Sequence, residues 1–183
     1  MLERKVKFKY IQLVTLSLIF SFAAEGKLKK IQVNNENLVI DTPNNWQIAK
    51  HFLNSQYTFF GPYKDGRRPV FSVNKTTLKD YSFNKQQLES SQVNYQSGRK
   101  DWLKKNKGRL LRFIPYKEVN WKHIKKVQSI GYNYILLDES FEERTYFFKC
   151  AGKVFNYTTL MTLNEKRIYK SVVDKILEST KCN

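Results

Sequence analysis

Four carboxylates close together are the first residues in this chain that suggest catalysis. Asp138, Glu139, Glu142 and Glu143 lie within six residues of one another, between two segments that look like strands. Neighbouring carboxylates catalyse hydrolysis when burial raises the pKa of one of them, which then acts as an acid. Consecutive acids in a turn are more often solvated, and here they also offset a strongly basic chain. A carboxylate-based hydrolase is therefore one alternative for the function.

The other residue types that carry catalysis or bind metals are scarce. The chain has two histidines, His51 and His123, and two cysteines, Cys150 and Cys182. It lacks the H-E-x-x-H zinc motif, the G-x-S-x-G nucleophile motif and a glycine-rich phosphate loop. We expect no catalytic residue, no metal site and no cofactor. An even cysteine count in an exported chain predicts a disulfide between the two cysteines, with two free buried thiols as the alternative.

The basic residues are concentrated in one segment. The chain carries a formal net charge of +17, and residues 99–126 hold eleven Lys and Arg against two acids. A field of this sign favours an acidic protein or an anionic envelope component, such as a lipid headgroup or lipopolysaccharide. Solvated lysines without a ligand are the alternative. The candidate residues for binding an anionic partner are Arg99, Lys100, Lys104, Lys105, Lys107, Arg109, Arg112, Lys122, Lys125 and Lys126.

Aromatic residues accompany the charges in two places. In the basic segment, the aromatic rings could stack on nucleic-acid bases; they are Trp102, Phe113, Tyr116 and Trp121. We expect Trp102 and Phe113 in the core, and export makes nucleic acid a poor partner. Further upstream, four aromatic residues gather where a hairpin is predicted, and an exposed patch there would mark a binding surface. We expect at least half of these residues in the core; they are Tyr57, Phe59, Phe60 and Tyr63.

The N-terminal residues have the three parts of a secretory signal peptide. A positive region that includes Arg4 and Lys5 precedes an apolar stretch, residues 11–22, and Ser21-Phe22-Ala23 fits the small-x-small cleavage rule. The apolar stretch is shorter than the ~20 residues that span a bilayer. We therefore expect cleavage after Ala23, with an uncleaved anchor as the alternative. Residues 24–183 would then form a single domain in the bacterial periplasm or outside the cell.

Pattern and turn residues predict an α+β fold for that domain. A short strand at 38–40 precedes a hairpin of strands 56–60 and 68–75. A helix over 84–106 follows, with Leu88, Tyr95 and Trp102 as its apolar seam and Gly108 as its C′ residue.

A meander and a second helix complete the prediction. The strands are expected at 109–116, 126–137, 145–150 and 153–161, with Ala151-Gly152 as the last turn. A capping box from Thr162 to Glu165 then begins a helix. The apolar stripe of this helix, with Ile168 and Ile176, should pack on the sheet.

The order of these elements resembles the PsbP-like superfamily, which includes a Ran-binding nuclear transport factor and bacterial periplasmic proteins. The resemblance lies in the Phe59-Phe60-Gly61-Pro62 turn, the strand after it, the long helix, the late Tyr146-Phe147-Phe148 strand and the closing helix. It implies an antiparallel sheet flanked by helices on both faces, an α/β/α sandwich. It also implies a non-enzymatic accessory or partner-binding protein.

The leading hypothesis from the sequence is a soluble exported accessory protein. It binds an acidic protein or an anionic envelope component through a basic face. The hydrolase is one alternative, and a purely structural envelope domain is the other.

Overall fold

The computed structural model describes residues 28–33, 38–64, 66–76 and 85–182. The predicted signal peptide, residues 1–23, lies outside this part of the chain. Its cleavage and the assignment of residues 24–183 to one domain stay predictions. Neither helix in the described residues combines the length and hydrophobicity needed to cross a membrane.

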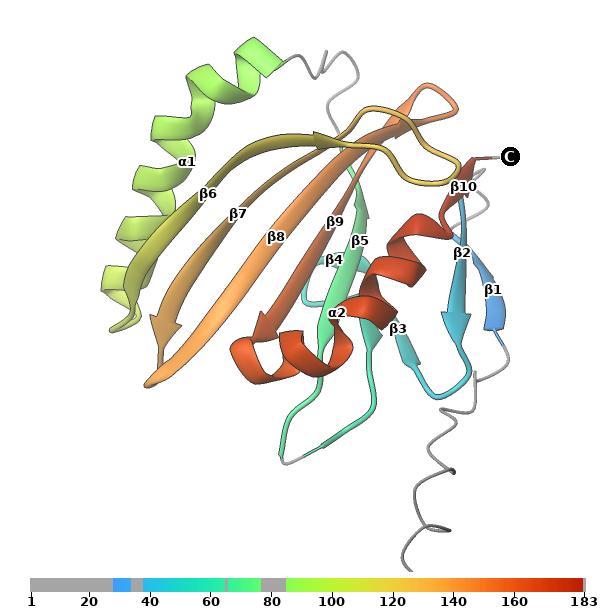
Figure 1. Ribbon diagram of the computed structural model, residues 1–183, viewed down its shortest axis with the longest axis horizontal. Helices are drawn as coiled ribbons and strands as arrows, with labels where there is room; N and C mark the ends of the chain where they lie inside the picture. The colour runs from blue at the N-terminus through green and yellow to red at the C-terminus, as the bar shows by residue number, and fades with distance from the viewer. Residues whose placement is uncertain (1–27, 34–37, 65, 77–84, 183) are drawn as a thin grey trace, which may run out of the picture.

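The described residues form two antiparallel sheets and two helices (Figure 1). The larger sheet has seven strands in the order β3-β4-β5-β9-β8-β7-β6, and the smaller has the order β1-β2-β10. The elements in chain order are β1 (Leu28–Gln32), β2 (Leu38–Pro43), β3 (Gln47–Phe52), β4 (Ser55–Phe60), β5 (Val70–Lys75), α1 (Lys85–Lys105), β6 (Arg109–Val119), β7 (Val127–Leu136), β8 (Glu139–Cys150), β9 (Lys153–Thr162), α2 (Leu163–Glu178) and β10 (Lys181–Cys182).

The strands predicted after the first helix form the expected meander, because β6, β7, β8 and β9 pair in succession. The hairpin of β4 and β5 is also confirmed, with Tyr57 opposite Val73. β9 then pairs with β5, which joins the early hairpin to the meander in one sheet. Three strands were not predicted. Polar residues make up three of the five in β1 and three of the six in β3, and β10 has only two residues.

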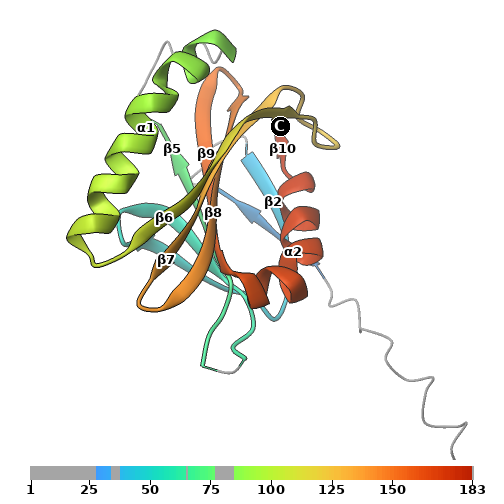
Figure 2. The same ribbon diagram turned by 60° about the vertical axis from the view of Figure 1, so that its left-hand side comes forward.

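The helices lie on opposite faces of the seven-stranded sheet, as the sandwich prediction requires (Figure 2). On one face, α2 and the smaller sheet enclose a large apolar core that includes Ile40, Phe71 and Leu177. On the other face, α1 lies over β6 and β7, and Leu103 packs against tyrosines of β7. Each fully buried large apolar side chain stabilises the fold by roughly 1.5–3 kcal/mol. Two cores therefore hold one helix to each face.

The apolar seam predicted for α1 is wrong. Tyr95 and Trp102 are 37% and 42% exposed, and the side chain of Leu88 lies outside the described residues. Among the side chains of this helix that the structure describes, Leu103 is the one that is fully buried. Since α1 covers the edge of the sheet, it buries only a narrow face. Part of that face is the stem of Arg99, which a hydrophobic pattern counts as polar.

The C-terminus of α1 is a Schellman motif, displaced by one residue from the prediction. The Gly108 N–H donates to the Leu103 carbonyl at 2.7 Å, and the Lys107 N–H donates to the Lys104 carbonyl at 3.3 Å. Lys107, with a φ of 56°, is therefore the left-handed C′ residue, and Gly108 follows it. Gly108 is required for a different reason. A Cβ there would lie 2.7 Å from the Ile135 carbonyl oxygen.

This geometry predicts opposite effects for two neighbouring substitutions. Lys107→Gly should stabilise the fold by about 0.5–1 kcal/mol, because the left-handed conformation strains every residue with a Cβ. Gly108→Ala should destabilise it by about 1–3 kcal/mol, the usual range for an overpacked contact. Chemical denaturation of both variants measures the two changes. If the C′ residue were Gly108, Lys107→Gly would instead destabilise the protein.

The capping box predicted for α2 is present. The Glu165 N–H donates to Thr162 Oγ1 at 3.2 Å, and the Thr162 N–H donates to Glu165 Oε2 at 2.7 Å. The apolar stripe is buried only in the second half of the helix. Ile176 is buried, whereas Ile168 is 45% exposed. Only the second half of α2 therefore packs into the core.

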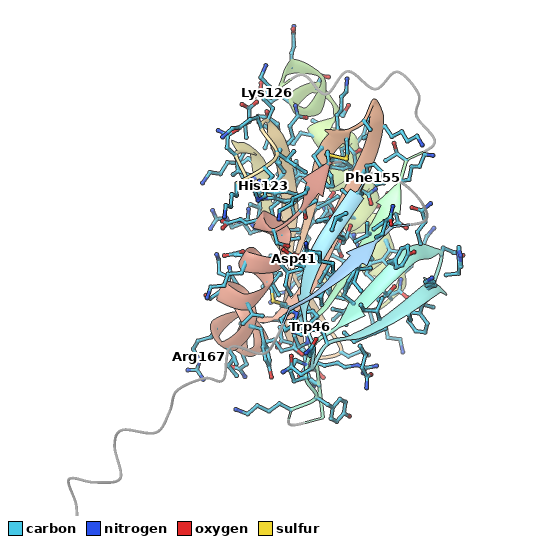
Figure 3. All side chains as sticks on the ribbon, turned by 90° about the vertical axis from the view of Figure 1, so that its right-hand side faces the viewer. Asp41, Trp46, His123, Lys126, Phe155 and Arg167 are labelled. Carbon is cyan, nitrogen blue, oxygen red and sulfur yellow. A yellow bond between two sulfur atoms is a disulfide. The ribbon has the colours of Figure 1, made fainter. Side chains whose placement is uncertain are left out.

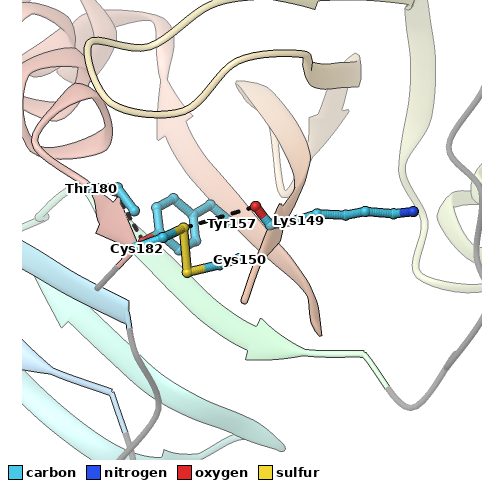
Figure 4. Close-up of a disulfide and its surroundings, with 5 residues drawn as sticks. All are labelled: Lys149, Cys150, Tyr157, Thr180 and Cys182. Atoms are coloured by element: carbon cyan, nitrogen blue, oxygen red, sulfur yellow. Dashed lines mark hydrogen bonds between the residues drawn. A yellow bond between two sulfur atoms is a disulfide. The ribbon is translucent and has the colours of Figure 1, made fainter. Parts of the chain in front are cut away.

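The end of the chain is fastened to the core by the expected disulfide (Figure 4). Cys150, the last residue of β8, is bonded to Cys182 in β10, and their Cα atoms are 5.4 Å apart. Thr180 lies two residues before Cys182 in the chain, and its hydroxyl group forms a buried hydrogen bond of 3.1 Å with that of Tyr157. Cys182 also pairs with Leu38 of β2. These contacts hold the smaller sheet to the larger one.

Candidate functional site

The structure divides the basic segment into two groups at opposite ends of β6 (Figure 1). Seven residues of the strand, 113–119, separate Arg112 from the β6–β7 loop, or about 23 Å at 3.3 Å per residue. All members of both groups are exposed. The first group, here the α1–β6 basic surface, is Lys100, Lys104, Lys105, Lys107, Arg109 and Arg112. The second, the β6–β7 loop group, is Lys122, Lys125 and Lys126.

The β6–β7 loop group is presented by an ordered loop. The side chains of Trp121 and Ile124 point into the large core, and the Trp121 N–H donates to the Ile124 carbonyl at 2.9 Å. The charged residues between and after them are therefore directed outward. Figure 3 shows His123 and Lys126 at one end of the molecule, and Arg167 of α2 toward the other.

Arg99 belongs to neither group, because it is held in the second core. Its Nη2 pairs with Glu143 Oε1, and the two side chains are only 22% and 12% exposed. Its guanidinium carbon also lies 5.1 Å from the ring centroid of Trp102, 5.0 Å from that of Tyr132 and 5.8 Å from that of Tyr134. Arg99 therefore joins α1 to the sheet, and it is not part of the exposed basic surface.

The expectation of a solvated turn is wrong for three of the four carboxylates, because Glu139, Glu142 and Glu143 are residues of β8. Only Leu137 and Asp138, with φ of 51° and 61°, form the turn between β7 and β8. Glu142 is buried, and Glu143 is nearly so. Because successive side chains of a strand point to opposite faces, Glu142 faces α2 and Glu143 faces α1. The two buried carboxyl groups cannot act together in one site.

Each buried carboxylate has its own partners. Burial raises the pKa of Glu143, and the Arg99 charge and hydrogen bonds from Tyr134 and Arg99 oppose this effect without cancelling it. The Tyr134 hydroxyl donates to Glu143 Oε2 at 3.3 Å. On the other face, Glu142 accepts from Arg144 Nε at 3.2 Å and from Lys166 Nζ at 2.5 Å. Both carboxylates thus fasten a helix to the sheet.

A cleft of about 430 Å³ lies beside Glu142, between α2 and the sheet. Its floor comes from β6 to β9, one wall from α2, and its end from the start of the β6–β7 loop. Basic side chains line it from three elements: Lys117 on β6, Arg144 on β8, and Lys166 and Lys170 on α2. The cleft combines these cations with aromatic and aliphatic side chains.

Tyr146 contributes a hydroxyl group to the same cleft. Burial is the main reason that its pKa rises, to about 12, so the group stays protonated and is able to donate. This hydroxyl makes no hydrogen bond to any residue that the structure describes. The cleft therefore offers a hydrogen-bond donor beside the guanidinium of Arg144.

The cysteines have a structural role. Both sulfur atoms are in the disulfide, which removes them as thiolate ligands for zinc. No group of three or more metal-binding side chains occurs within the described ranges. The exposed His123 lies in the β6–β7 loop, far along the chain from His51 at the end of β3.

The aromatic residues of the first hairpin are mainly core residues, as expected. Tyr57 and Phe59 are buried, and Phe60 lies under the guanidinium group of Arg68 at 4.2 Å. Tyr63 alone of the four is strongly exposed, at 71%. Of the four rings, Tyr63 therefore stands apart as the one directed into solvent.

Sequence reasoning missed the cleft. Its basic residues come from three elements, and Lys166 and Lys170 lie in a helix that was predicted only to pack. One signal was present: in α2, Lys166 and Lys170 are four residues apart and share one face. The carboxylates that drew attention in the sequence mark the strand that forms part of the floor.

The amino-acid sequence matches no family model and no curated protein. The fold does match solved structures. The cyanobacterial PsbP protein CyanoP from Synechocystis sp. PCC 6803 aligns with a TM-score of 0.60 over 92% of this chain and 99% of that chain, at 10% identity. LpqN of Mycobacterium tuberculosis, involved in cell envelope biogenesis, aligns with a TM-score of 0.52 over 84% of this chain and 89% of that chain, at 13% identity.

The Saccharomyces cerevisiae Ran-binding protein Mog1p aligns with a TM-score of 0.47 over 84% of this chain and 94% of that chain, at 8% identity. The alignments with CyanoP and LpqN show that the chain has a PsbP-like fold, as the sequence resemblance implied. At these identities, the likeness establishes the fold and leaves the ligand to be argued from the residues themselves.

Proposed function

We propose that this protein is an exported, non-enzymatic accessory protein that binds an acidic protein through the α1–β6 basic surface. The observation that carries this proposal is the exposure of all six of its Lys and Arg side chains, which run from α1 through the turn into β6. The neighbouring acid on the helix is Asp101. A concentrated positive field of this kind steers an acidic partner and orients it.

Exposed apolar side chains next to the basic residues favour a protein as the partner. Trp102 is exposed next to the basic side chains, and Leu111 is exposed on β6. Trp and Arg are enriched at the centres of protein interfaces, and lysines are typical of the rim. Since β6 is the outermost strand of the sheet, one partner would reach both the helix and the strand.

Export is supported by the disulfide, because disulfides persist mainly in oxidising compartments. The similar fold of LpqN, which is involved in cell envelope biogenesis, is in keeping with a role in the envelope. The hydrolase alternative is disfavoured, because Glu142 and Glu143 face opposite sides of the sheet and each is ion-paired.

A four-residue charge variant tests the proposed surface. Changing Lys100, Lys104, Lys105 and Lys107 to Gln should weaken binding about 30-fold at low salt, taking about 0.5 kcal/mol for each exposed ion pair. The measurement is the affinity for a partner captured by the wild-type chain from the envelope fraction of its own organism. Binding by the wild-type chain should also fall as salt rises, because screening shortens to ~3 Å at 1 M.

The matched control removes the same charge at the other end of β6. In this control variant, four other exposed lysines are changed to Gln: Lys122, Lys125, Lys126 and Lys149. This control should bind as the wild-type chain does. Equal weakening by both variants would show that net charge alone matters and would overturn the assigned surface.

Binding of the wild-type chain to anionic lipid vesicles, with no protein captured, would assign the surface to an envelope lipid and contradict a protein partner. If the wild-type chain captured no protein and bound no vesicles, a purely structural domain would be favoured.

A further inference from the structure

The cleft between α2 and the sheet lies on the face opposite α1, and the proposed partner surface does not account for it. Its volume of about 430 Å³ falls within the range of small-molecule sites, roughly 300–1,000 Å³. Rigid elements supply its floor and wall, with β8 at the centre and α2 alongside. Its side chains are therefore held in place before any ligand arrives.

The inner part of the cleft has an excess of positive charge. Arg144 and Lys166 line it, with the exposed ammonium group of Lys117 beside them, against Glu142 as the one buried acid. Both oxygens of Glu142 are occupied, one by Arg144 Nε and the other by Lys166 Nζ. These four groups together carry a net charge of +2. The ion pair with Arg144 uses only Nε, so its guanidinium can still bind an oxyanion through its terminal nitrogens.

The remaining acids of the cleft lie at its rim. Asp174 pairs with Lys170 four residues earlier on α2, and both side chains are more exposed than those of Glu142, Arg144 and Lys166. Glu178 is exposed near the end of the helix. Charges in contact with water are strongly screened, so these acids act weakly on an anion held deeper in the cleft. The inner charge therefore decides which ligand is favoured.

Apolar side chains surround this basic centre. Trp121 closes one end, with its ring 5.8 Å from the Tyr146 ring, and Met161 and Val173 lie along the floor and wall. An inorganic ion would leave this surface in contact with water. A ligand that carries an apolar group next to its charge would bury it, at roughly 25 cal/mol for each Å² removed from water.

We propose that the cleft binds a small organic anion, with a carboxylate or phosphate group beside an apolar or aromatic portion. The oxyanion accepts hydrogen bonds from Arg144, Lys117 and the hydroxyl of Tyr146. That hydroxyl makes no hydrogen bond to the described residues, and a pocket donor of this kind fixes the position of a ligand oxygen. The apolar portion packs against Trp121. This site is independent of the proposed partner surface.

Calorimetric titration of the oxidised full chain with three probes tests the proposal. Phenyl phosphate and benzoate carry a ring, whereas inorganic phosphate does not. Phenyl phosphate or benzoate should bind saturably at one site, and phenyl phosphate should bind more tightly than inorganic phosphate. The tighter of the two aromatic probes identifies the preferred oxyanion. Absence of saturable binding by both aromatic probes would overturn the proposal, as would equal affinity for phenyl phosphate and inorganic phosphate.

Two variants locate the site. Tyr146→Phe removes only the hydroxyl group and should weaken binding of the preferred probe about tenfold, since a hydrogen bond to a charged group contributes about 1.5 kcal/mol. Lys117→Gln changes an exposed side chain, and it should weaken binding of the same probe about threefold to tenfold. The matched control is Lys122→Gln, which removes the same charge from the nearby loop and should leave binding unchanged. Wild-type affinity in both cleft variants would overturn the site, and this outcome would not affect the α1–β6 basic surface.

Discussion

The Arg99→Met variant is expected to unfold about 2–3 kcal/mol more easily than the wild-type chain at neutral pH. Removing one partner of a buried ion pair costs about 3–5 kcal/mol, and the partial exposure of Arg99 lowers that figure. Met keeps the apolar stem but leaves the carboxylate of Glu143 facing the second core without its cation. Urea denaturation measures the change, and α1 should lose its amide-exchange protection first.

The loss of stability caused by Arg99→Met should increase as the pH rises. Burial already raises the pKa of Glu143 in the folded protein, and Arg99 opposes that rise. A group whose pKa is raised on folding contributes stability below its unfolded pKa, and this contribution is lost as the pH rises through its folded pKa. Without Arg99 the folded pKa rises further. The destabilisation of Arg99→Met should therefore be large near about pH 7.5 and shrink toward about pH 4.5, close to the ordinary Glu value.

Two further variants separate the ion pair from the rest of the helix. Lys100→Met alters the next residue of α1, which is exposed, and should change stability by less than about 0.5 kcal/mol. The double variant Arg99→Met with Glu143→Leu removes both charges and should regain most of the lost stability. Equal destabilisation of Arg99→Met at both pH values would show that lost packing is the cause and that the unpaired carboxylate is not.

Loss of the disulfide should have the largest effect on stability. Replacing Cys150 and Cys182 with Ala should lower the free energy of unfolding by about 4 kcal/mol, the chain-entropy value for a loop closed by residues 32 apart. The bond also holds β10, which has only two residues and pairs with β2 at the edge of the smaller sheet. Thermal unfolding of the variant should show a correspondingly lower Tm.

The local consequence can be measured separately. Amide exchange should accelerate first in β10 and then in β2, while the β6–β9 meander keeps its protection. The wild-type chain under reducing conditions is the matched control and should behave as the double variant does. A loss of stability below about 1 kcal/mol would contradict the expected constraint on the unfolded chain.

Local features of the fold were readable from the sequence because they depend on residues close together in the chain. The Thr162–Glu165 capping box involves one helical turn, and it forms as predicted. Ala151 and Gly152 both have a positive φ, as a two-residue hairpin turn between β8 and β9 requires. The meander follows from the same short connections. The order of elements was enough to imply the PsbP-like sandwich.

Errors arose wherever a residue's role depended on what lies across the sheet. The alternation of β8 sends Glu142 and Glu143 to opposite faces, so four acids that are adjacent in the sequence form no common site. Arg99 lies in a basic segment, but its partner is 44 residues away. Trp102 belonged to the apolar seam predicted for α1, but it is half-exposed because α1 covers only the edge of the sheet.

The sequence by itself determined the basic charge, the pairing of the only two cysteines, both hairpins and the start of the last helix. Only the tertiary structure decided which cations face water, which carboxylates are buried, and where the cleft forms. Lys117, Arg144 and Lys166 meet in that cleft because β6, β8 and α2 are brought together by strand pairing and by packing of the apolar side of α2. Such convergence depends on contacts between distant parts of the chain, which no local pattern records.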